Sequence, residues 1–145
     1  MSDLPIHYNN EVTPTPAKVT ECVNFASKYY NVNPSVIRAI IAVEGGKIGT
    51  MSRNSNGTYD MGIMQINTIH IKDLRKRFPT LNLTRKKISN GACVNIFLAV
   101  DILNRRIKEN SNYWLGVGSY HSKTPKYRNR YLKKIYKAYK RIVSP

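Results

Sequence analysis

The longest apolar pattern in the chain runs from about Asn90 to Lys108, and it constrains the fold more than any other segment. Apolar side chains recur there every three or four residues: Cys93, Ile96, Phe97, Val100, Leu103 and Ile107. This spacing predicts an α-helix with one wide apolar face. Because the helix is long and strongly apolar, we expect it to be the central helix of a mainly α protein.

Shorter segments carry the start and stop signals of further helices. Asn33 can cap a helix whose first residue is Pro34, and Gly45 together with Gly46 ends it, since glycine accepts the left-handed conformation of a C-terminal cap. The remaining expected helices lie near residues 16–30, 67–78, 113–120 and 126–143. The dipeptide Asn56-Gly57 predicts a short β-hairpin over residues 52–60.

The length of 145 residues predicts one domain. We expect it to span residues 17–145, after a leader over residues 1–16 that contains three prolines and no core pattern. No apolar segment approaches the roughly 20 residues of a membrane span. The N-terminus lacks the basic start and apolar stretch of a signal peptide, so we expect either a trimmed chain or export by another route.

The charge is extreme, with 24 Lys and Arg against 8 Asp and Glu, a formal net charge of +16. Residues 72–87 carry seven bases and residues 123–141 carry nine. Such a field attracts polyanions, which leaves nucleic acid, anionic lipid and the anionic bacterial wall as candidates. Nothing in the chain reads as a helix-turn-helix or an aromatic RNA-binding platform, which argues against nucleic acid.

The two cysteines, Cys22 and Cys93, lie far apart without a Cys-x-x-Cys motif or a Cys/His cluster. This argues against zinc, and the sequence predicts neither a metal site nor a cofactor. Two buried thiols and one structural disulfide both remain open, and a disulfide would indicate an oxidising compartment.

Glu44 is the candidate with the clearest chemistry. It lies four residues after Ile40 and three after Ile41, so it shares their apolar helix face. Loss of water disfavours the charged carboxylate there, and the negative end of the helix dipole acts in the same direction. Both effects favour a proton donor, which glycosidic cleavage requires. The alternative is a Glu that turns to solvent or pairs with Arg38 or Lys47.

Two further features bear on Glu44. Gly45 and Gly46 leave room for a bulky ligand to approach the backbone beside the acid, or serve only to cap the helix. Asp60 would be the second carboxylate of a usual glycoside hydrolase, or would brace the hairpin, as Asp often does in turns.

These residues form part of a longer ordered pattern. Glu44 is followed by Asn56-Gly57-Thr58-Tyr59-Asp60 and then by Gly62-Ile63-Met64-Gln65-Ile66-Asn67-Thr68-Ile69-His70. Cys22, Cys93-Val94-Asn95-Ile96, Trp114, Gly118, Tyr120-His121-Ser122 and Tyr131 complete it. The pattern resembles lytic transglycosylases of the lysozyme-like superfamily, in the branch that accompanies specialised secretion and conjugation machines. The resemblance implies a goose-type lysozyme/transglycosylase fold and a disulfide between Cys22 and Cys93.

The resemblance also implies a mechanism. Glu44 would protonate the bridging oxygen of the β-1,4 bond between N-acetylmuramic acid and N-acetylglucosamine, and would then take the proton of the muramoyl 6-hydroxyl to close a 1,6-anhydro ring. The substrate's N-acetyl group would assist, so that no second carboxylate is required. Tyr131 would hold Glu44 by a hydrogen bond, and Met64, Gln65 and Tyr120 would line the sugar groove. The full implied set of binding and supporting residues is Ser52, Ser55, Asp60, Met64, Gln65, Asn67, Tyr120, His121 and Tyr131, with Ser52 or Ser55 positioning the acid and His121 at the groove rim.

Two rival functions remain. The segment from Gly57 to Asn67 also resembles animal-type lysozymes, which implies hydrolysis by Glu44 and Asp60. A protein of another class would keep the fold as a basic scaffold that binds nucleic acid or the wall. On the favoured reading the partners are peptidoglycan glycan strands, together with secretion or conjugation machinery or an inhibitor protein, and the enzyme acts in the bacterial periplasm or cell wall.

Overall fold

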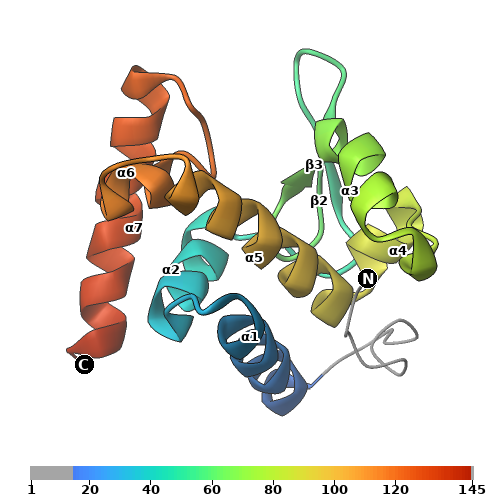
Figure 1. Ribbon diagram of the computed structural model, residues 1–145, viewed down its shortest axis with the longest axis horizontal. Coiled ribbons are helices and arrows are strands. Elements are labelled where there is room, and N and C mark those ends of the chain that lie inside the picture. The colour runs from blue at the N-terminus through green and yellow to red at the C-terminus, as the bar shows by residue number, and fades with distance from the viewer. Residues whose placement is uncertain (1–14, 145) are drawn as a thin grey trace.

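Helix α5 (Ala92–Lys108) lies at the centre of the computed structural model, which describes residues 15–144 (Figure 1). Every residue from Ala92 to Leu103 is buried. In Figure 1, α6 and α7 lie to one side of α5, and the sheet with α3 and α4 lies to the other. The central helix predicted over 90–108 is therefore confirmed.

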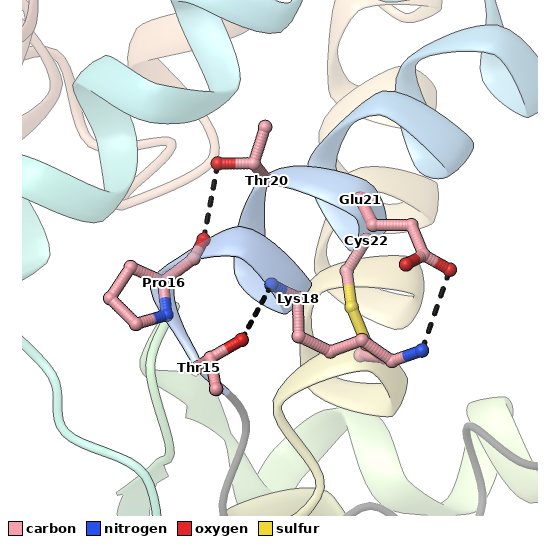
Figure 2. Close-up of a disulfide and its surroundings, with 7 residues drawn as sticks. Thr15, Pro16, Lys18, Thr20, Glu21 and Cys22 are labelled. Atoms are coloured by element: carbon pink, nitrogen blue, oxygen red, sulfur yellow. Dashed lines mark hydrogen bonds and ion pairs between the residues drawn. A yellow bond between two sulfur atoms is a disulfide. The ribbon is translucent and has the colours of Figure 1, made fainter.

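Helix α1 (Pro16–Tyr30) packs along α5, and a disulfide between Cys22 and Cys93 joins the two helices. Figure 2 shows the start of α1, where the hydroxyl of Thr15 accepts a hydrogen bond from the Lys18 amide at 3.1 Å. Thr15 and Pro16 thus belong to the beginning of α1. The rest of the expected leader, residues 1–14, lies outside the described residues.

Helix α2 (Pro34–Glu44) has the predicted bounds. The Asn33 side chain accepts from the Ser35 amide at 2.8 Å, and Gly45 ends the helix with a left-handed φ of 62°. Ile37 and Ile40 are fully buried, and α2 packs along α7. The apolar stripe of α2 thus fixes the direction in which its last residue points.

The sheet has three antiparallel strands in the order β1 (Met51–Arg53), β2 (Tyr59–Met61) and β3 (Ile66–Asn67). Strands β1 and β2 form the predicted hairpin, in which Asp60 lies opposite Ser52. Strand β3, where Asn67 lies opposite Asp60, is an addition to the prediction. It has only two residues, too few to show the alternation by which a strand is recognised.

The remaining elements are η2 (Thr68–His70), α3 (Ile71–Arg77), η3 (Pro79–Leu81), α4 (Arg85–Asn90), α6 (Tyr113–Gly118) and α7 (Pro125–Val143). The helix predicted to end at Phe78-Pro79 is found as η2 and α3. The hydroxyl of Thr84 caps α4 by accepting a hydrogen bond from the Lys87 amide. The sequence did not predict α4 as a helix separate from α5. In the part of the chain described here, no helix is both long and apolar enough to cross a membrane.

Asn95 joins α5 to the sheet and is completely buried. Its carboxamide accepts from the Met64 amide at 2.9 Å and donates to the carbonyls of Met61 and Ile88, each at 2.9 Å. These three bonds satisfy backbone groups of the turn between β2 and β3 and of α4. The loop that lies beside Glu44 is therefore anchored on the central helix.

Candidate active site

Glu44 is the last residue of α2, and its side chain is 11% exposed. The Tyr131 hydroxyl on α7 donates to Glu44 Oε2 at 2.8 Å. His121 Nδ1 lies 3.5 Å from the same oxygen, and the His121 ring stacks on the Tyr131 ring with centroids 4.3 Å apart. Within residues 15–144, both polar contacts of Glu44 are therefore made through Oε2.

The alternative partners of Glu44 lie elsewhere. The Arg38 guanidinium donates to the Thr20 hydroxyl at 2.9 Å. Among the residues that the structure describes, the Glu44 carboxylate pairs with neither Arg38 nor Lys47. The carboxyl turns inward to α7 rather than outward to solvent.

Three titratable side chains near Glu44 have raised pKa values, and each therefore favours its protonated form. Burial, and then the charge of Glu44, raise the pKa of the Tyr131 phenol, so that it remains a neutral donor. The hydrogen-bonding contact with Glu44 raises the pKa of His121, which favours its protonated form. Burial and the charges of Glu44 and Asp60 likewise raise the pKa of Tyr120.

Two cavities meet at Glu44 and His121. The cavity on the side of the sheet has a volume of about 290 Å³ and is lined by Glu44, Asn54, Asn56, Thr58, Asp60, Gln65, Ile66, Asn67, Ile69, His70, Ile102, Tyr120 and His121. The cavity on the side of α7 has a volume of about 240 Å³ and is lined by Val43, Glu44, His121, Tyr127, Arg130, Tyr131 and Lys134. An acid shared by two adjoining cavities can meet an extended ligand in its middle.

Asp60 and Asn67 face the sheet-side cavity from paired strands. The Asn67 side chain donates to Asp60 Oδ1 at 3.0 Å and to the Thr58 hydroxyl at 3.0 Å, and it accepts from the Ile69 amide at 3.0 Å. Asn67 therefore ties the hairpin to the start of η2. Asp60 takes part in this brace while one face of it borders the cavity.

Gln65 lies in the turn between β2 and β3 with a φ of 54°, a left-handed conformation that is uncommon for a residue with a side chain. Its amide Nε2 donates to the Gly62 carbonyl at 2.8 Å. Such outliers concentrate at functional sites. Gly46 packs directly on this turn, because a β-carbon there would lie 2.1 Å from the Gly62 carbonyl oxygen.

The two glycines after Glu44 thus have different roles. A β-carbon on Gly45 would meet nothing within 4 Å, which agrees with an open approach beside the acid. At Gly46 the free space is instead filled by the turn itself, so the expected approach of a ligand to both glycines is wrong at Gly46.

Met64 is fully buried in the core and lines neither cavity at Glu44, so the expectation that its side chain lines the sugar groove is wrong. It contributes through its backbone, because the Tyr120 hydroxyl donates to the Met64 carbonyl at 2.7 Å. Ser52 and Ser55 also lie outside both linings, on the exposed hairpin. The hydroxyl that contacts Glu44 belongs to Tyr131, 87 positions further along the chain.

The structure adds residues to which the sequence patterns gave no role at the site. His70 borders the sheet-side cavity, where burial and then Arg106 and Arg105 lower its pKa to about 4, so it is neutral near pH 7. Arg130 and Lys134 border the α7-side cavity. The sequence shows both residues only as members of the basic cluster 123–141. Among the described residues, no group of three or more His, Cys, Asp or Glu is arranged to hold a metal ion.

Residues 21–143 match the family described as Transglycosylase SLT domain. Invasion protein IagB of Salmonella typhimurium strain LT2 is 32% identical over 127 residues, which cover 84% of this chain and 77% of IagB. Protein IpgF of Shigella flexneri is 31% identical over 129 residues, 86% of this chain and 82% of IpgF. A peptidoglycan-binding-like protein of Escherichia coli O157:H7 is 30% identical over 131 residues, 83% of this chain and 77% of that protein.

Proposed function

The chain belongs to the family of transglycosylase SLT domains and is a peptidoglycan lytic transglycosylase, and we propose that Glu44 carries out its reaction. The observation that supports this role is the shielded Glu44 carboxyl, held by the Tyr131 hydroxyl where two cavities meet. The bond cleaved is the β-1,4 bond between N-acetylmuramic acid and N-acetylglucosamine, and the product carries a 1,6-anhydromuramoyl end.

Glu44 acts twice in the proposed cycle. The protonated acid first gives its proton to the bridging oxygen as the bond from that oxygen to muramoyl C1 breaks. The N-acetyl group of the same sugar assists at C1. The Glu44 carboxylate then takes the proton of the muramoyl 6-hydroxyl while that oxygen bonds to C1. The acid ends as it began, and water is not consumed.

The two oxygens of Glu44 have different tasks. Oε2 accepts a hydrogen bond from the Tyr131 hydroxyl and lies beside His121. We assign proton transfer to Oε1, because the contacts at Oε2 orient the carboxyl and leave the other oxygen for substrate. Tyr131 and His121 are positioning residues in this scheme, while Gln65 and Tyr120 border the sugar-binding groove.

Asp60 has a structural role in this proposal, since its side chain is engaged by Asn67 within the hairpin brace. The competing function is hydrolysis by Glu44 and Asp60. The observation that supports this second candidate is that both residues line the same cavity.

Product analysis separates the two reactions. Wild-type enzyme is expected to release anhydromuramoyl ends from purified wall by mass spectrometry, whereas reducing ends would identify a hydrolase. Glu44→Gln should abolish cleavage, and Asp60→Asn should retain most of it. Equal loss in both variants would exclude a purely structural Asp60.

The site of action and the partners follow from the substrate. We propose that the enzyme works in the periplasm or cell wall on glycan strands, with its basic surface held on the anionic wall. Secretion or conjugation machinery and an inhibitor protein remain proposed partners. A nucleic-acid-binding module would instead show salt-sensitive DNA binding that survives Glu44→Gln, with no wall cleavage by wild type.

A further inference from the structure

The cavity between Glu44 and α7 differs in charge from the cavity on the side of the sheet. Among residues 15–144, its lining includes Arg130 and Lys134, and Glu44 is the one carboxyl there. As far as the described residues show, the sheet-side lining contains no Lys or Arg, and it carries the two carboxylates of Glu44 and Asp60 beside neutral amides and hydroxyls. The two halves of the groove therefore suit chemically different parts of one substrate.

Arg130 and Lys134 are free to bind an anion. They lie one helical turn apart on α7, which places both on the same face. Within residues 15–144, no carboxylate pairs with either side chain. The Arg130 guanidinium lies 5.9 Å from the centre of the Tyr127 ring, which supports it at the cavity wall. The contact with Glu44 raises the pKa of His121, and the positive charge of Lys134 partly opposes that rise. The charge of Lys134 therefore acts within the site.

We infer that this cavity is a subsite for a carboxylate carried by the muramoyl unit of the substrate, with Arg130 and Lys134 as its binding residues. The inference rests on the proposed function. N-acetylmuramic acid differs from N-acetylglucosamine by a lactyl ether, whose carboxyl is either free or joined to a peptide that bears its own carboxylates. A cationic subsite on one side of Glu44 therefore tells the two sugars apart. Val43 and Tyr127 supply apolar surface for the methyl group of a lactyl or alanyl unit.

Binding without turnover tests the subsite directly. The full chain carrying Glu44→Gln is titrated with three muramoyl tetrasaccharides that carry stem peptides with free carboxylates, free lactyl carboxylates, or lactyl methyl esters. The same titrations are made after Arg130→Gln and Lys134→Gln together. The matched control is Lys133→Gln with Lys140→Gln, which removes the same charge from α7 where it borders other cavities, beside Trp114 and Tyr136.

Loss of Arg130 and Lys134 is expected to weaken binding of a carboxylate-bearing ligand about three- to tenfold, the sum of two ion pairs made by exposed residues. The methyl ester should bind unchanged, and the control variant should bind all three ligands like its parent. A loss confined to the stem-bearing ligand assigns the subsite to stem carboxylates, and a loss confined to the free acid assigns it to the lactyl group.

Two results would overturn the inference: an equal loss for the methyl ester, or an equal loss in the control variant. Either would mean that the bases act only as general positive charge. Because binding is measured in a chain that does not cleave, failure of the proposed reaction is seen separately, as absence of anhydromuramoyl ends from wild type.

Discussion

Replacing Tyr131 with Phe should lower kcat for wall cleavage about 10- to 100-fold and leave KM near the wild-type value. The substitution removes the hydroxyl that donates to Glu44 Oε2 at 2.8 Å. It keeps the aromatic ring, which is 5% exposed and packed in the core. A hydrogen bond to a charged group contributes about 1.5–3 kcal/mol, and each 1.36 kcal/mol changes a rate about tenfold. His121, the second positioning residue, compensates only in part, because it lies 3.5 Å from Oε2 and is 48% exposed.

The assay follows anhydromuramoyl ends over time by mass spectrometry across a range of wall concentrations. Thermal unfolding of each variant reports whether the fold is intact. Tyr139→Phe is the matched control, because it removes a hydroxyl from the same helix where the ring packs on Trp114, with centroids 5.2 Å apart. A Tyr131→Phe enzyme that keeps more than half of the wild-type kcat would refute the positioning role.

Three further predictions concern the frame of the site. Asn95→Ala should lower the free energy of unfolding by about 3–5 kcal/mol in urea titrations, because the three buried backbone groups that it serves lose their partner. Gly45→Ala should lower the free energy of unfolding by about 1–2 kcal/mol, because the left-handed φ alone disfavours alanine. Gly46→Ala should lower it further and reduce activity, since its β-carbon would collide with the Gly62 carbonyl. Equal losses of stability in the two variants would contradict this packing. The lowered pKa of His70 means that the unfolded chain binds more protons between pH 6.5 and about 4, so stability should fall as pH falls through that window. His70→Gln should flatten this slope, and an unchanged slope would contradict the burial argument.

The helices were predictable where their signals are local. Asn33, Pro34 and Gly45 define both ends of α2, and the structure shows the cap at each. Helix α4 was not predicted because its six residues contain one apolar side chain, Ile88, which is too few to show a helical spacing. A helix that short owes its stability to packing rather than to its own sequence.

The candidate site divides in the same way. The spacing of Glu44 from Ile40 indicates a partly buried face without any tertiary information. The orientation of Met64 and Gln65 depends instead on the turn before β3, where Gly62 and Gln65 both have positive φ. This turn directs Met64 into the core and Gln65 to the groove, and neither hydropathy nor spacing encodes it.

The basic residues illustrate the same limit with a functional consequence. The sequence shows nine bases between residues 123 and 141 but not which of them face Glu44. The structure brings Arg130 and Lys134 to the acid and directs Lys133 and Lys140 to other cavities. The net charge therefore does not show that the bases of α7 line different cavities.

Chemistry and substrate selection should consequently be separable in this enzyme. Tyr131 contacts Glu44 and would stabilise the carboxylate as it forms, so removal of its hydroxyl should lower kcat. Arg130 and Lys134 would bind a carboxylate that does not react. Because they would bind it equally well in the ground state and the transition state, their removal should raise KM rather than lower kcat. Combined variants on the two sets should then be nearly additive, with kcat following Tyr131 and KM following the bases. Strong coupling between them would instead mean that the charged branch of the substrate helps to orient Glu44 itself.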